Sequence, residues 1–166
     1  SGPSFAAELV RDLPTAVTLA TTNSELSNSV AKIFHHGSMR VYLSDDIAGV
    51  TVGGSLKNII AIASGISDGM GFGNNARAAL ITRGIAEITR FGKALNASEE
   101  TFVGLAGIGD LLLTCTGQYS RNREVGIRLA EGKSLDEILS SLGHVAEGVN
   151  ACYEVFNRIK HENIDM

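Results

Sequence analysis

The sequence predicts a mainly α-helical protein that opens with a small β-α-β unit. Apolar and polar residues alternate only within residues 1–45, and a two-residue period is typical of strands. In the rest of the chain, apolar residues recur at three- or four-residue steps, as in Ile81, Ile85 and Ile88, which is the helical period. We therefore expect two parts, residues 1–45 and an all-α domain over residues 46–166.

The opening unit is predicted to contain two strands with a helix between them. Residues 15–21 and 39–43 alternate in the manner of strands, and the helix runs from about Ser24 to His35. Asn23 or Ser24 is suited to cap this helix. Because two strands do not form a stable sheet by themselves, we expect the rest of the sheet to lie outside this chain.

Local signals mark helix ends within the all-α part. Ser134 and Glu137 have the spacing of a capping box, which predicts a helix from Ser134 to about Leu142. The glycines between Gly65 and Gly73 predict a helix break where backbones approach closely. No element closes the domain at the carboxyl end, so we expect a truncation there.

Composition narrows the range of functions. The 166 residues are 44% hydrophobic, which suits one domain or slightly more. A net charge of −4 without a Lys/Arg stripe argues against nucleic acid as a partner. No unbroken apolar stretch approaches the roughly 20 residues of a membrane span, and no signal peptide is evident. We expect a cytoplasmic protein without an integral membrane segment, and the apolar helical surface suggests a homodimer.

The cysteine and histidine residues do not have metal-ligand spacing. Cys115 and Cys152 lie far apart and outside any Cys-x-x-Cys pattern, which argues against a zinc site or a disulfide framework. His35 and His36 are neighbours and point to different sides of a helix. We expect no metal and two reduced, packed thiols.

A single cation stands on an otherwise uncharged helical stretch. Between Val52 and Gly65 the only charged residue is Lys57, and Ala61 follows it on the same face. This face of small residues, which continues to Gly65, can admit a small ligand beside the amine. The alternative is that Lys57 extends past its apolar neighbours into solvent, and this segment alone does not decide between the two.

A second polar cluster follows downstream. Asp110 precedes an apolar run, and Ser120, Arg121 and Asn122 come shortly after it. Asp110 can orient Lys57, accept a hydrogen bond from a substrate hydroxyl, or cap a helix. Together the two clusters offer an amine, a carboxylate, a guanidinium and an amide.

Arg121 is the natural candidate to bind an anion in this cluster. Its planar fork of donors matches phosphate oxygens. Taken by itself, however, Ser-Arg-Asn is also an ordinary polar start of a helix. We expect the nearby Arg123 and Arg128 to be solvated charges.

Five motifs occur in an order that resembles one enzyme family. They are Ser1-Gly2-Pro3-Ser4-Phe5-Ala6, Gly53-Gly54-Ser55-Leu56-Lys57-Asn58, Asn74-Asn75-Ala76-Arg77-Ala78-Ala79-Leu80-Ile81-Thr82-Arg83-Gly84, Gly107-Ile108-Gly109-Asp110-Leu111 and Ser120-Arg121-Asn122-Arg123. Over nearly the whole chain they resemble bacterial-type NAD(P)-dependent glycerol-3-phosphate dehydrogenase. The resemblance implies the tail of a Rossmann domain in residues 1–45. It implies a helical substrate-binding domain, similar to the C-terminal domain of 6-phosphogluconate dehydrogenase, in residues 46–166.

The resemblance also implies an activity. The family interconverts sn-glycerol 3-phosphate and dihydroxyacetone phosphate by hydride transfer with NAD or NADP, a reaction that feeds glycerophospholipid synthesis. Lys57 matches the family's proton acceptor. The Gly-x-Gly-x-x-Gly turn and a second substrate-binding lysine of the family are absent from this sequence. We therefore expect this chain alone to be inactive, and the choice between NAD and NADP is not predicted.

Further site residues follow from the resemblance, which implies a phosphate-bearing small molecule as the substrate. The implied substrate contacts are Gly2, Ser4, Lys57, Asp110, Ser120, Arg121 and Asn122. The implied cofactor contacts are Ala6, Arg121, Val145 and Glu147.

Two alternatives stay open. The chain can be a helical oligomerisation or binding module without catalysis, because half of the expected cleft is missing. It can also belong to a related dehydrogenase of the 6-phosphogluconate or β-hydroxyacid type. Those enzymes use substrates that bear a carboxylate, whereas Arg121 predicts a phosphate monoester.

Overall fold

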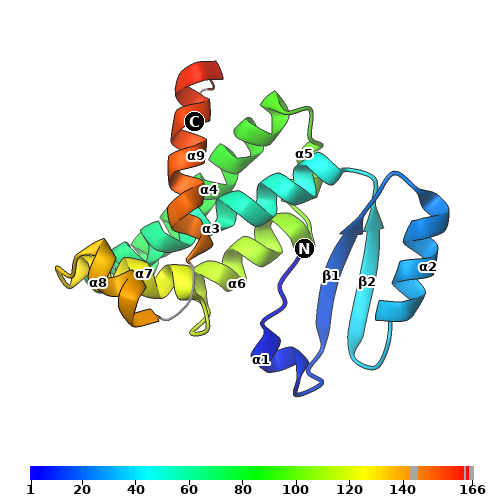
Figure 1. Cartoon of the computed structure of the whole chain (residues 1–166), viewed down its shortest axis with the longest axis horizontal. Coiled ribbons are helices and arrows are strands. Elements are labelled where there is room, and N and C mark those ends of the chain that lie inside the picture. Colours follow the sequence, from blue (N-terminus) through cyan, green and yellow to red (C-terminus); the bar gives the residue numbers. More distant parts are fainter. Residues whose placement is uncertain (143–145, 163, 165–166) are drawn as a thin grey trace.

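A computed structural model describes residues 1–142, 146–162 and 164. Figure 1 shows the β-α-β unit to one side of the helical part, with the N-terminal segment running between them. The first group comprises α1 (Ala6–Leu9), β1 (Thr15–Ala20), α2 (Ser24–Phe34) and β2 (Met39–Ser44). The second group comprises α3 (Ile47–Gly69), α4 (Gly73–Ala94), α5 (Glu99–Phe102), the π-helix η1 (Leu105–Gly109), α6 (Asp110–Thr116), α7 (Arg121–Ala130), α8 (Leu135–Leu142) and α9 (Glu147–Glu162). The predicted mainly α fold is confirmed.

The β-α-β unit forms as its local sequence predicts. β1 and β2 pair in parallel, with Thr15 opposite Met39, and α2 connects them. Asn23 is the N-cap of α2, and its side chain accepts a hydrogen bond from the main-chain nitrogen of Leu26 at 2.9 Å.

The N-terminal segment lies against β1. The main-chain nitrogen of Thr18 donates to the carbonyl of Ser1 at 2.7 Å, and the nitrogen of Ser1 donates to the carbonyl of Thr18 at 2.9 Å. Gly2 lies at φ +142°, and a side chain there would meet the main chain of Val17 at 3.0 Å. Because Gly2 has no side chain, the N-terminal segment can lie directly against β1 before it passes along the helical part.

The main core surrounds α3. Leu56 of α3, Ile88 of α4, Phe102 of α5 and Leu111 of α6 are almost fully buried within one apolar cluster. A smaller cluster joins α7 to α8 through Val125, Ile138 and Ala146. Because α3 contacts α4, α6, α7 and α9, it serves as the scaffold for the helical part.

By length and composition alone, α3 could also cross a membrane. It has 23 residues and is the one such helix found among the described residues. The sequence-based expectation had found no stretch of this kind. Core helices of other proteins pass the same test, and α3 has neighbouring helices packed around it (Figure 1), so its apolar character has an explanation within the fold.

The start of α3 is fixed by Asp46. Its carboxylate accepts hydrogen bonds from the nitrogens of Gly49 at 2.8 Å and Ser98 at 3.0 Å, and from the hydroxyl of Thr101 at 2.6 Å. Burial raises the pKa of Asp46, but these hydrogen bonds outweigh it and hold the pKa below its ordinary value. One carboxylate thus joins the first turn of α3 to α5.

Near its end, α3 meets α7 backbone to backbone. A Cβ at Gly65 would lie 2.0 Å from the carbonyl oxygen of Arg123, and one at Gly126 would lie 2.0 Å from that of Ile62. The predicted close approach of backbones is confirmed at Gly65, whereas Gly71 and Gly73, at the predicted helix break, have no neighbour within 4 Å of a Cβ. The predicted ligand face is only partly right, because Ala61 and Gly65 are buried and only its Lys57 end is open.

At its middle, α3 makes a second contact of this kind with η1. A Cβ at Gly53 would lie 2.4 Å from the carbonyl oxygen of Ala106. Lys57 follows Gly53 by four residues, and Asp110 follows Ala106 by four residues. Lys57 lies about one helical turn beyond Gly53, whereas the backbone between Ala106 and Asp110 bends at Gly107 (φ −104°, ψ −105°). The contact therefore brings the Lys57 and Asp110 segments close together, and the bend at Gly107 sets the direction in which α6 begins.

The contact at Gly53 predicts opposite outcomes for two adjacent substitutions. Gly53→Ala should lower the free energy of unfolding by about 1–3 kcal/mol, because the new methyl group clashes with backbone that side-chain rotation cannot move. Gly54→Ala is the matched control, since its Cβ would meet only the Ser1 hydroxyl, at 3.2 Å, and alanine favours a helix by up to about 1 kcal/mol over glycine. Urea unfolding of both variants measures the difference, and equal stabilities would contradict the account.

The two thiols provide a pH-dependent test of the core. Burial, and next the charge of Asp68, raise the pKa of the Cys115 thiol to about 12, although Arg123 opposes them. Burial also raises the pKa of Cys152, which is only partly covered. Because the thiolate is the reactive form, Cys115 should resist a disulfide reagent at pH 8 and gain reactivity only as the pH rises or the chain unfolds.

The rate of reaction is to be measured in Cys115→Ala and Cys152→Ala, so that each variant reports one thiol. We expect Cys115 to react in a slow phase, and this phase should disappear in Cys115→Ala. Rapid modification of Cys115 in the folded protein at pH 8 would show that the core around α6 is open.

Candidate functional site

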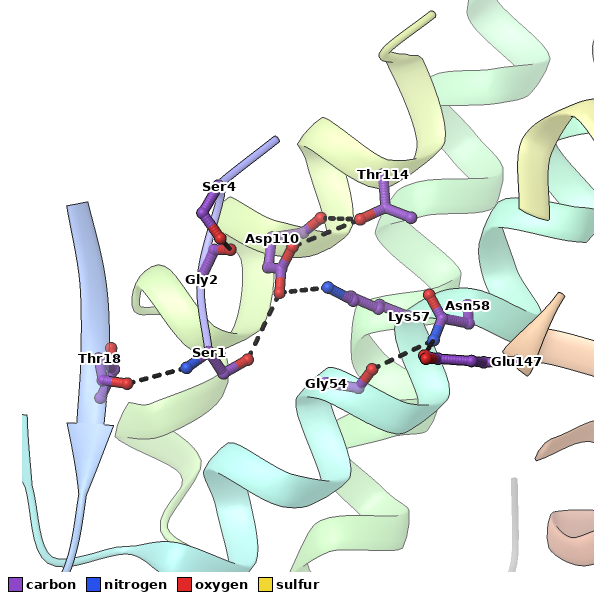
Figure 2. A network of polar contacts seen from close by, with 10 residues as sticks. All are labelled: Ser1, Gly2, Ser4, Thr18, Gly54, Lys57, Asn58, Asp110, Thr114 and Glu147. Atoms are coloured by element: carbon purple, nitrogen blue, oxygen red, sulfur yellow. Dashed lines mark hydrogen bonds and ion pairs between the residues drawn. The ribbon is translucent and has the colours of Figure 1, made fainter. Parts of the chain in front are cut away.

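Lys57 and Asp110 form the centre of the site. Lys57 extends from the middle of α3, and Asp110 begins α6, with the lysine Nζ 2.5 Å from Oδ2 of the aspartate (Figure 2). The lysine side chain is 20% exposed and the aspartate side chain 5%. Since a carboxylate removed from water needs a partner, the pair holds the amine at the edge of solvent. Lys57 therefore does not extend freely into solvent.

Two hydroxyl groups hold the Asp110 carboxylate from its other sides. The Ser1 hydroxyl donates to Oδ2 at 3.4 Å, and the Thr114 hydroxyl lies 3.4 Å from Oδ1 while donating to the Asp110 carbonyl at 2.6 Å. Asp110 is the first residue of α6, and Gly109 occupies the cap position. The orienting role therefore fits the geometry, whereas the capping role does not.

The first turn of α7 presents the second polar group. Ser120 is the N-cap, and its hydroxyl accepts a hydrogen bond from the nitrogen of Arg123 at 3.3 Å. The Asn122 side-chain oxygen accepts one from the nitrogen of Gly148 at 3.0 Å. Arg121 is exposed and forms no ion pair or hydrogen bond with any residue that the structure describes. Its guanidinium is available to an anion, and the helix N-terminus adds partial positive charge beside it.

A cavity of about 590 Å³ brings these groups together. Its size is in the range of small-molecule sites. All predicted site residues within the described part of the chain line it: Gly2, Ser4, Ala6, Lys57, Asp110, Ser120, Arg121, Asn122 and Glu147. Val145 lies outside the described residues. Four of the five sequence motifs thus meet at one place, whereas the motif from Asn74 to Gly84 contributes no residue to the cavity.

The N-terminal segment lines one side of this cavity with small residues. Gly2 is buried, and Ser4 turns its hydroxyl back onto the carbonyl of Gly2 at 2.9 Å. Ala6 and Ala7 are exposed, line the cavity and have no side-chain atom beyond a methyl group. A flat ring can approach this side closely, so the residues present fit the edge of a dinucleotide site.

Asn58, Thr114 and Tyr119 are among the cavity residues that the sequence reasoning missed. Asn58 is 6% exposed, and its amide lies 3.4 Å from the Gly54 carbonyl and 3.5 Å from Oε2 of Glu147. Thr114 contacts Asp110, and Tyr119 stacks edge-on against Phe5 with ring centroids 5.7 Å apart. Asn58 gave a usable signal, because it is a polar residue beside Lys57 on an apolar helix. Thr114 gave another, since it lies one turn after Asp110.

Two expectations about arginines prove wrong. Arg123 is not a solvated charge, because its side chain is 21% exposed and paired with Asp68. Arg128 is tied to Glu124 at 2.7 Å and to the hydroxyl of Ser141 at 2.9 Å. Within the described residues, no group of His, Cys, Asp and Glu gathers as a metal site.

Comparisons with known proteins agree on one family. Residues 46–166 match the family described as the C-terminus of NAD-dependent glycerol-3-phosphate dehydrogenase. Over all 166 residues the chain is 65% identical to a glycerol-3-phosphate dehydrogenase [NAD(P)+] of Methylobacillus flagellatus and 56% identical to one of Burkholderia orbicola. The match covers 100% of this chain and 50% of each relative, so the chain spans about half the length of the curated relatives it matches.

Solved structures show the same fold. The glycerol-3-phosphate dehydrogenase of Coxiella burnetii superposes with a TM-score of 0.98 at 47% identity, covering 100% of this chain and 51% of that one. That of Saccharomyces cerevisiae superposes with a TM-score of 0.86 at 32% identity, covering 96% of this chain and 49% of that one. From the family match, the identities and these superpositions, we conclude that the chain belongs to the family of NAD-dependent glycerol-3-phosphate dehydrogenase C-terminal domains.

Proposed function

We propose that this chain supplies the substrate-binding and proton-transferring half of an NAD(P)-dependent glycerol-3-phosphate dehydrogenase. One observation carries the proposal: the Lys57–Asp110 pair and the unpaired Arg121 line the same cavity. This arrangement offers a proton-carrying group and an anion-binding group to one small molecule. In this proposal residues 1–45 are the tail of the dinucleotide-binding domain, residues 46–166 form the substrate domain, and the protein works in the cytoplasm.

The substrate in this proposal is sn-glycerol 3-phosphate or dihydroxyacetone phosphate. Arg121 binds the phosphate through its planar fork of donors, and the Asn122 amide and the Ser120 hydroxyl add neutral contacts. Gly2 and Ser4 contact the rest of the substrate from the N-terminal segment. A single guanidinium at the phosphate end suits a monoester and discriminates against the unphosphorylated triose.

Lys57 moves the proton in the proposed reaction. When bound, the nicotinamide cofactor supplies or accepts the hydride at C2 of the substrate. During reduction, the Lys57 ammonium donates a proton to the C2 oxygen, and during oxidation the amine accepts it. Asp110 fixes the direction of the Lys57 side chain through the ion pair. Ala6, Arg121, Val145 and Glu147 are the proposed contacts to the cofactor, with either NAD or NADP.

The alternative of a binding module without catalysis is tested by completing the cleft. In a chimera, these 166 residues replace the matching half of the Methylobacillus flagellatus relative, to which they are 65% identical. We expect the chimera to oxidise NADH or NADPH with dihydroxyacetone phosphate. A folded chimera without this activity would favour the module. Sedimentation of the same chimera tests the proposed homodimer.

Two substitutions in the active chimera separate the proposed roles. Lys57→Arg should lower kcat by roughly 100-fold or more with little change in KM, because a guanidinium keeps the charge but does not exchange the proton. Arg121→Ala should raise KM for dihydroxyacetone phosphate by roughly 10- to 100-fold, the value of a charged hydrogen bond. Initial rates of cofactor oxidation measure both effects.

The matched control is Lys133→Arg, at an exposed lysine paired with Glu131, which should leave both constants unchanged. Near-parental kcat in Lys57→Arg would refute the proton-transfer role. Equal activity on a 2-hydroxy acid and on the phosphate ester would refute the substrate class.

A further inference from the structure

Asp68 binds two arginines although it does not line the cavity. It lies near the end of α3, with its side chain 12% exposed. Arg77 of α4 reaches both carboxylate oxygens, at 3.0 and 3.1 Å. Arg123 of α7 reaches Oδ2 through Nε at 2.8 Å and through Nη2 at 2.7 Å. One carboxylate therefore ties three helices together.

The Asp68 ion pairs add side-chain contacts between α3 and α7 near the place where two glycines bring the two backbones together. Gly65 and Gly126 bring the backbones of α3 and α7 together, but residues without side chains do not interlock as ridges and grooves do. Asp68 follows Gly65 by three residues, and Arg123 precedes Gly126 by three. The ion pair thus lies about one turn from the glycine contact on each helix, where it resists rotation and sliding of α7.

The rotation of α7 decides where Arg121 points. Positions two apart on a helix face directions about 200° apart, so a helix that turns Arg123 toward Asp68 turns Arg121 away from it. Arg121 indeed lines the cavity. Ser120 holds the main-chain nitrogen of Arg123 while Asp68 holds its guanidinium, so this residue is fixed at both ends.

We propose that Asp68, acting through Arg123, is a positioning residue that holds Arg121 at the phosphate position of the cavity. It also keeps the Arg123 guanidinium engaged away from that position, which leaves Arg121 as the phosphate ligand. The inference rests on the proposed function, because Arg121 matters only if a phosphate-bearing substrate binds.

The test compares variants of the chimera described above. Asp68→Asn keeps the shape but loses the charge, and it should raise KM for dihydroxyacetone phosphate roughly 10-fold while kcat changes less than about threefold, because a displaced binding group weakens binding. In the Arg121→Ala background, Asp68→Asn should raise KM no further, since the group it positions is gone. Glu99→Gln, which breaks the exposed pair with Lys93, is the control and should change nothing.

A second pair of variants, at Arg123, tests the same ion pair in case Asp68→Asn does not fold. Arg123→Lys keeps a cation for Asp68 and should stay within about threefold of the parental KM, whereas Arg123→Gln should match Asp68→Asn. Melting temperatures of all variants report folding separately from KM.

The outcomes distinguish this inference from the proposed function. If Arg121→Ala raises KM and the folded Asp68→Asn and Arg123→Gln variants do not, the inference is wrong and the proposed function stands. An equal KM increase for Asp68→Asn with and without Arg121 would show a purely structural role and would also overturn it. A folded parent chimera without activity would refute the proposed function and this inference with it.

Discussion

Backbone contact between α3 and the segments beside it is the constraint on which the rest of the structure depends. Gly53 meets the Ala106 carbonyl, and Gly65 meets that of Arg123. No side chain can stand between backbones at these places, so the separation of the helices is fixed within a narrow range. Lys57 follows Gly53 by four residues and Asp68 follows Gly65 by three, about one helical turn in each case, so both side chains start from well-fixed backbone.

The arrangement of charges follows from this placement. Partly buried charges are stable only with partners, and the structure pairs Lys57 with Asp110 and both Arg77 and Arg123 with Asp68. Arg121 takes part in none of these pairs and stays exposed at the cavity. The cavity therefore combines an oriented proton carrier with an open anion-binding group, and this combination suits a small phosphorylated alcohol or ketone better than a neutral ligand.

Local signals predicted much of the fold, because each depends on residues that are neighbours in the chain. The Asn23 cap forms as expected. So does the capping box, in which the Ser134 nitrogen donates to Oε2 of Glu137 at 2.9 Å and the Glu137 nitrogen lies 3.4 Å from the Ser134 hydroxyl. The contacts within the site were harder to predict from the sequence, because Lys57 and Asp110 are 53 positions apart.

The expectation that Arg123 is a solvated charge was wrong for the same reason, a contact between residues far apart in the sequence. Its partner Asp68 is 55 positions away, and nothing in the Ser-Arg-Asn-Arg segment distinguishes a paired arginine from a solvated one. The resemblance to a family brought the cavity residues together by motif, but it assigned no role to Asn58, Tyr119 or the cluster around Asp68. The contacts of Tyr119 and of the Asp68 cluster emerged only from packing.

The most direct test of the account is a crystal structure of the chimera with dihydroxyacetone phosphate bound. The account predicts the phosphate at the Arg121 guanidinium, the C2 oxygen within about 3 Å of Lys57 Nζ, and Asp68 still paired with Arg123. A phosphate bound by Lys57 or Arg123, with Arg121 turned away to solvent, would contradict it.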